Sequence, residues 1–99
     1  MRRFSLIADD NVVCVDGLAH RVDVSDIDQD VHAVQWHSTW GEIEFKGHRK
    51  PNQRFTDFSP FQKFVARWAA VDSALKVEAA AKRAVGKPAT STGKPNVIG

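Results

Sequence analysis

The sequence predicts one α+β domain, an antiparallel β-meander of about five strands packed on one long C-terminal amphipathic helix, with an extended tail after it. Short runs that alternate between apolar and polar residues, separated by turn residues, fill positions 3–46 and are typical of antiparallel strands. Apolar residues then recur at helical spacing from about 60 to 85. Because 99 residues suit one small core, we expect a single domain at 1–85 and a tail at 86–99.

The first three strands are expected at 4–8, 12–15 and 20–24, where β-branched and aromatic residues are frequent. Asp9-Asp10-Asn11 separates the first two strands with turn residues. Asp16-Gly17 suits a tight turn, because glycine tolerates a positive φ. These three runs predict a meander.

An acidic connector follows the third strand. Ser25 and Asp28 have the spacing of a capping box, which predicts a single helical turn. Asp26, Asp28 and Asp30 also match the first ligands of a calcium loop. The sixth position of that loop lacks the required glycine and the twelfth lacks the glutamate. We therefore expect solvated carboxylates here, not a calcium site.

A second hairpin is predicted at His32–Phe45, with its turn at Ser38–Gly41. Strict alternation places His32, Val34 and Trp36 together on one face of its first strand. The residues expected in the core are Val34, Trp36, Ile43 and Phe45.

Residues 46–56 are polar, basic and interrupted by Gly47 and Pro51, so we expect an exposed loop. Trp40, in the turn before it, is either a lid on the small core or an anchor for a partner, and the sequence leaves both open. Together they predict a partner-binding surface. Its residues are Trp40, His48, Arg49, Lys50, Arg54 and Phe55.

The helix is expected to begin with Ser59 as its N-cap, Pro60 at the first helical position and Gln62 completing a capping box. Phe58 is expected to pack on the next turn, against Lys63 or Phe64.

The body of the helix carries an apolar stripe that should hold it on the sheet. Its members are Phe61, Phe64, Val65, Trp68 and Leu75. About 25 residues make a helix of nearly 40 Å, longer than short strands cover. The distal part, 76–85, is therefore expected to project, either solvated or packed on a partner chain.

Composition and charge argue against several classes of protein. The net charge of +2 is a narrow excess and gives no support to nucleic-acid binding. No apolar run approaches the roughly 18 residues of a membrane span, and the start has no signal-peptide core, so we expect a cytosolic protein. Cys14, the only cysteine, is expected to be a buried reduced thiol. The four histidines lack the further cysteines of a common zinc site.

No catalytic constellation emerges from the residues. Glu42 and Glu44 share one face of a strand, but a glycosidase pair needs a cleft, and none is indicated. The segment 86–94 departs from a phosphate-binding loop in its glycine spacing and has Pro95 where Ser or Thr is needed. We expect no enzymatic activity, no cofactor and no metal.

Two segments, VHAVQWHSTWGEIEFK and PNQRFTDFSPFQKFVARWAA, resemble small proteins encoded among the tail and tail-fibre genes of tailed bacteriophages and prophages. The similarity spans about residues 30–72 and lies in the order of its parts. These are a HAVQW strand, a Gly-Glu-Ile-Glu-aromatic strand, a Pro-Asn step, an FSPFQ helix start and a Trp-containing amphipathic helix. The resemblance implies a virion or tail-assembly role and supplies no catalytic residues.

From this resemblance we expect a non-enzymatic structural accessory component of a phage virion, in the tail or tail fibres, present in the host cytoplasm during assembly. Its partners would be other tail or tail-fibre proteins, or copies of itself. One alternative is a tail-fibre assembly chaperone absent from the mature particle, whose signature would be an exposed apolar groove. A second is a small host-directed nucleic-acid-binding or inhibitor protein, which would bind nucleic acid with steep salt dependence.

Overall fold

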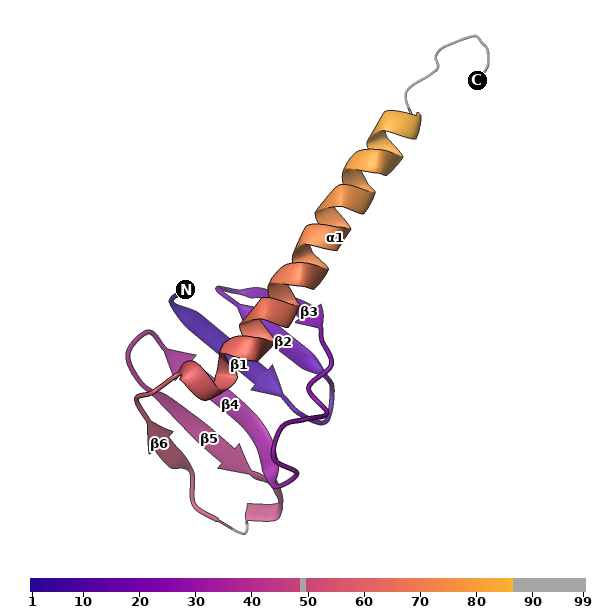
Figure 1. Cartoon of the computed structure of the whole chain (residues 1–99). Coiled ribbons are helices and arrows are strands. Elements are labelled where there is room, and N and C mark those ends of the chain that lie inside the picture. The colour runs from indigo at the N-terminus through magenta and orange to yellow at the C-terminus, as the bar shows by residue number, and fades with distance from the viewer. Residues whose placement is uncertain (49, 87–99) are drawn as a thin grey trace, which may run out of the picture.

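In the computed structural model, a six-stranded antiparallel sheet packs on one C-terminal helix, which confirms the predicted α+β fold class (Figure 1). The structure describes residues 1–48 and 50–86, so the predicted tail lies outside it from residue 87 onward. The strands are β1 (Arg3–Ile7), β2 (Val12–Val15), β3 (Leu18–Arg21), β4 (Val31–His37), β5 (Gly41–Phe45) and β6 (Gln53–Phe55). The helices are η1 (Lys46–His48), η2 (Ser59–Phe61) and α1 (Gln62–Gly86), of which the first two are 3-10 helices.

The sheet has the order β3-β2-β1-β4-β5-β6, so two three-stranded meanders join at the central pair of β1 and β4. In that pair Arg3 lies opposite His37, and Ile7 lies opposite Ala33. The predicted single meander is divided because the connector at 22–30 returns the chain from edge strand β3 to the middle of the sheet. Strand β6 lies within the segment predicted as a loop and pairs with β5.

One face of the sheet carries the hydrophobic core, which η2 and the start of α1 cover (Figure 1). Of the predicted core residues, Val34 and Trp36 are buried, whereas Ile43 and Phe45 are half-buried at the edge of the core. The buried cluster consists of Phe4, Leu6, Val13, Val15, Val22, Val24, Val31, Val34, Trp36, Phe61 and Phe64.

Strand β4 contains a bulge at His32. Val31 pairs with Phe45 and Ala33 pairs with Glu44, so one residue on β4 has no partner on β5. The extra residue leaves His32 exposed and gives the core-facing place to Val31. The predicted face of His32 was wrong, because strict alternation assumes a strand without an insertion.

Strand β3 ends before Val22, and the last part of the predicted third strand belongs to the connector. Val22 and Val24 are nevertheless buried, and both bond to Asn11. The Val22 amide donates to the Asn11 carbonyl oxygen at 2.8 Å, and the Val24 amide donates to Asn11 Oδ1 at 3.2 Å. Ser25 begins no helical turn, and the connector contains turns and a bend without helix. The Ser25 amide donates instead to Asp23 Oδ1 at 2.9 Å.

The chain enters α1 through η2, whose N-cap is Phe58 and not the predicted Ser59, and Phe58 makes no side-chain capping bond. Ser59 lies inside η2, and its amide donates to Oδ1 of Asp57 at 3.0 Å. Asp57 therefore satisfies a free amide at the start of the helix, and this bond lowers the pKa of Asp57. The Phe58 ring lies 5.0 Å from the rings of both Phe4 and Trp36, in the core and not on the next helical turn.

Helix α1 is fixed to β3 by two neighbouring contacts. The indole Nε1 of Trp68 donates to the carbonyl oxygen of Leu18 at 2.9 Å, and its ring lies 5.3 Å from the His20 ring. One turn later, Nε2 of His20 lies 2.9 Å from Oδ1 of Asp72. These contacts mark the end of the packed part of the helix.

Beyond Asp72, α1 projects past the sheet, as its length predicted (Figure 1). All residues from 73 to 82 are exposed. Leu75, predicted to hold the helix on the sheet, is instead 47% exposed. The apolar stripe is therefore confined to the first turns, because only there does a sheet lie beneath the helix.

The other face of the sheet, called the open face here, is not covered by any described element (Figure 1). Cys14 lies on this face and is half-buried, because its neighbours Val13 and Val15 point into the core. The expectation of a buried thiol was wrong, since an apolar run does not reveal which of its residues face the helix.

Candidate functional site

The predicted partner-binding residues do not form one surface. Trp40 and Arg54 lie together, with the Arg54 guanidinium carbon 4.3 Å from the centre of the Trp40 ring. His37, which the sequence did not single out, lies 4.6 Å from the same ring. We call His37, Trp40 and Arg54 the Trp40 cluster.

The Trp40 cluster lies on the open face, away from the core. His37 is the chain neighbour of Trp36 on β4, and Arg54 is the chain neighbour of Phe55 on β6. Because Trp36 and Phe55 face the core, alternation turns His37 and Arg54 to the open face. Trp40 itself is half-buried and is not among the residues that pack on the core. The tryptophan is thus held by a cation–π contact and an imidazole, and part of its surface remains exposed.

Phe55 lies on the opposite side of the sheet from this cluster. Its ring stacks 5.4 Å from that of Trp36 and lies 5.1 Å from that of Phe61. The stack passes over Gly41, where an added Cβ would lie 2.4 Å from the Gln35 carbonyl oxygen and 2.6 Å from Phe55 Cζ. Phe55 therefore closes the edge of the core.

Lys50 also lies apart from the Trp40 cluster. Its Nζ lies 3.5 Å from Oδ2 of Asp30 and 4.8 Å from the centre of the Phe45 ring. The Arg49 position and the His48 side chain lie outside what the structure describes. Of the four predicted residues whose side chains the structure describes, it brings together Trp40 and Arg54 only.

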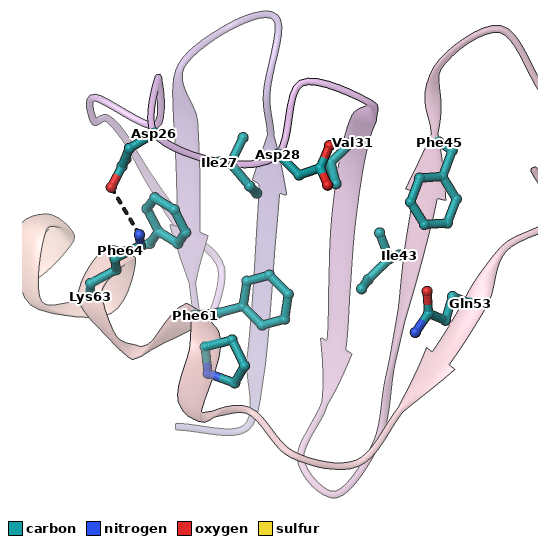
Figure 2. A pocket seen from close by; sticks show the side chains of 11 residues that line it. Asp26, Ile27, Asp28, Val31, Ile43, Phe45, Gln53, Phe61, Lys63 and Phe64 are labelled. Carbon is teal, nitrogen blue, oxygen red and sulfur yellow. Dashed lines mark ion pairs between the residues drawn. The ribbon is translucent and has the colours of Figure 1, made fainter.

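A pocket of about 280 Å³ opens on the core side of the sheet, between β4, β5, the connector and the start of α1 (Figure 2). Figure 2 shows Phe61 and Ile43 facing each other across it, with Gln53 of β6 at one rim. Its apolar lining comes from Ile27, Val31, Ile43, Phe45, Pro60, Phe61 and Phe64. The pocket could not be predicted from the sequence, because it depends on how the connector and β6 lie against β5 and the start of α1.

The other rim of the pocket carries an ion-pair network. Arg67 donates to both carboxylate oxygens of Asp26, at 2.7 and 2.9 Å, and Lys63 Nζ lies 2.9 Å from Oδ2. Hydrogen bonds from Arg67 and then Lys63 hold the pKa of Asp26 far below its usual range. The network ties the connector to α1, and Figure 2 shows its Asp26–Lys63 pair. Asp26, which the sequence analysis considered as a calcium ligand, is a member of these ion pairs.

Within residues 1–48 and 50–86, no three His, Cys, Asp or Glu side chains come together in a way that could hold a metal ion. Glu42 and Glu44 lie on the open face, and neither lines the pocket of Figure 2.

Comparisons with known proteins add no identification. No family model, curated protein or solved structure matches this chain. Among the described helices, none has the length and apolar content needed to cross a membrane.

Proposed function

We propose that this chain is a non-enzymatic accessory component of a bacteriophage virion that binds other tail or tail-fibre proteins. The observation that carries the proposal is the projecting half of α1, a continuous helix whose residues 73–82 are all exposed. Leu75 is 47% exposed and Val77 is 69% exposed on this segment. An isolated helix of this length has marginal stability in water, and a groove on a partner would stabilise it.

The charges of the projecting half favour a protein partner over nucleic acid. Lys76, Glu78 and Lys82 alternate in sign along it, and Lys76 already pairs with Asp72 at 2.9 Å. Nucleic-acid binding depends on many unopposed cations. The resemblance to phage tail proteins in residues 30–72 supports the same choice and supplies the kind of partner.

One observation favours an assembly chaperone as a second candidate. The pocket of Figure 2 is lined mainly by apolar side chains and remains open to solvent, as expected of a site that holds an apolar side chain of a client for a time. A chaperone would use this pocket and leave the finished particle, whereas a structural component would remain in it.

Quantitative mass spectrometry of purified phage particles tests the proposal. We expect the chain in particles at a fixed ratio to known tail proteins. Its presence in infected lysate together with its absence from particles would contradict a structural role and support the chaperone. Absence of any association with tail proteins in either sample would contradict both.

A matched pair of variants tests the role of the projecting helix. Leu75 and Leu18 are about equally exposed, at 47% and 48%, but Leu18 lies on edge strand β3. We expect Leu75→Asp to reduce incorporation into particles and Leu18→Asp to leave it unchanged. Equal incorporation of both variants would show that α1 is not the contact.

A further inference from the structure

One row of side chains on the open face runs across five strands and has opposite charges at its two ends. The cross-strand register places Arg21, Val12, Ile7, Ala33 and Glu44 in line from β3 to β5. The three central residues are apolar, and of these Ile7 and Val12 are still partly exposed. A sheet face that remains in water usually carries polar residues in these places.

We propose that the open face is the interface of a symmetric dimer, in which a second copy of this chain packs face to face with the first. The two-fold axis would run along β1 at Ile7, the middle of the row. It would place Arg21 of each copy opposite Glu44 of the other, and Val12 opposite Ala33. The row is thus complementary to itself, as a two-fold interface requires.

The polar centre of the neighbouring row can be covered at low cost. It contains Ala19, Cys14, Ser5, Gln35 and Glu42, in line from β3 to β5. The Ser5 hydroxyl lies 2.8 Å from Oε1 of Gln35 and donates to it, so this polar pair is already bonded within one chain. Removing such a pair from water costs less than removing unpaired groups.

The size of the face predicts a weak dimer. Five strands about 4.8 Å apart give a width of roughly 20 Å, which is small for a stable interface. We therefore expect dissociation in the micromolar range at low salt, and weaker association as salt screens the Arg21–Glu44 pairs. The inference rests on the sheet alone, so it can fail while the virion proposal holds.

Arg3 provides a matched control for Arg21. It is also an exposed arginine on the open face, but it lies on β1, the strand that would follow the axis. Its two copies would face each other, so Arg3 has no acidic partner in the dimer. Charge reversal at Arg21 should therefore weaken the dimer, whereas charge reversal at Arg3 should not.

Sedimentation equilibrium of the full chain at low salt is the test. We expect the mass to rise from 11.0 kDa toward twice that value with concentration. Arg21→Glu and Glu44→Arg should each weaken association about tenfold, because each replaces two attractions with two repulsions. The double variant should restore it. Thermal melting of each variant checks that the fold is kept.

Alkylation of Cys14 reports whether the open face is the surface that is covered. The thiol lies within the proposed interface, so its reaction rate should fall as the dimer forms. A chain that remains monomeric at millimolar concentration would overturn the proposal. A dimer that leaves the Cys14 rate unchanged, or that Arg3→Glu weakens as much as Arg21→Glu, would overturn it as well.

Discussion

His20 of β3 and Asp72 of α1 form the outermost contact between sheet and helix, with 2.9 Å between Nε2 and Oδ1. Hydrogen bonds from His20 and then Lys76 lower the pKa of Asp72 below its ordinary value of 3.8. The carboxylate therefore stabilises the folded state above that value, and its contribution is lost as the pH falls through the folded pKa.

We expect Asp72→Asn to lower the melting temperature at neutral pH and to have an effect that shrinks as the pH falls below 3.8. Thermal unfolding of both proteins across this range measures the difference. Asp10→Asn, in an exposed turn, is the control and should have little effect at either pH. A constant difference between the parent and Asp72→Asn at all pH values would contradict the assignment.

Trp68 contributes both a hydrogen bond and a packed ring, and two substitutions separate them. Trp68→Phe removes the indole donor to Leu18 and keeps a ring beside His20, so it should cost about 1 kcal/mol. Trp68→Ala removes both and should cost about 3 kcal/mol. Urea unfolding measures the two values. Equal losses would mean that the ring itself contributes nothing.

Gly41 is required by the packing around it. A Cβ at this position would meet the Gln35 carbonyl oxygen and the Phe55 ring, so Gly41→Ala should cost about 1–3 kcal/mol of unfolding free energy. Gly17→Ala is the comparison, because Gly17 has open space around it and a φ of +90°. Its cost should come from backbone strain alone. A fully stable Gly41→Ala would show that Phe55 does not stack as described.

Trp40 should contribute little to stability, because it lies on the open face. We expect Trp40→Ala to cost about 1 kcal/mol and to keep the fold. A double-mutant cycle with Arg54→Ala should give a coupling of about 0.5–1 kcal/mol for the cation–π contact. Loss of folding in Trp40→Ala would instead place this ring in the core.

Local pattern was sufficient to predict most of the architecture. Alternation located β1, β2, β4 and β5, and the turn at Asp16-Gly17 has the positive φ angles expected of its residues. Length alone predicted that α1 would project. The fold class could be predicted because each of these signals is local and repeats over several residues.

The features that failed depend on contacts between distant segments. The three residues of β6 are too few to show a strand period, so this segment was predicted as a loop. The helical segment begins at Ser59 as predicted, but its N-cap is Phe58, and the Ser59 amide is bonded to Oδ1 of Asp57. The partner surface was predicted from residues that are neighbours in the sequence. Because side chains alternate along β6, Arg54 and Phe55 lie on opposite faces of the sheet.

The bulge at His32 has a consequence for the comparison of related chains. If His32 were deleted, Val31 would stand next to Ala33, and the strand would alternate regularly. All remaining side chains of β4 would keep the faces that they have now. We therefore expect the domain to tolerate a one-residue deletion here and to lose its core after a deletion at Val34. Relatives of this chain should show their length variation within β4 at this position, although strand interiors rarely accept it.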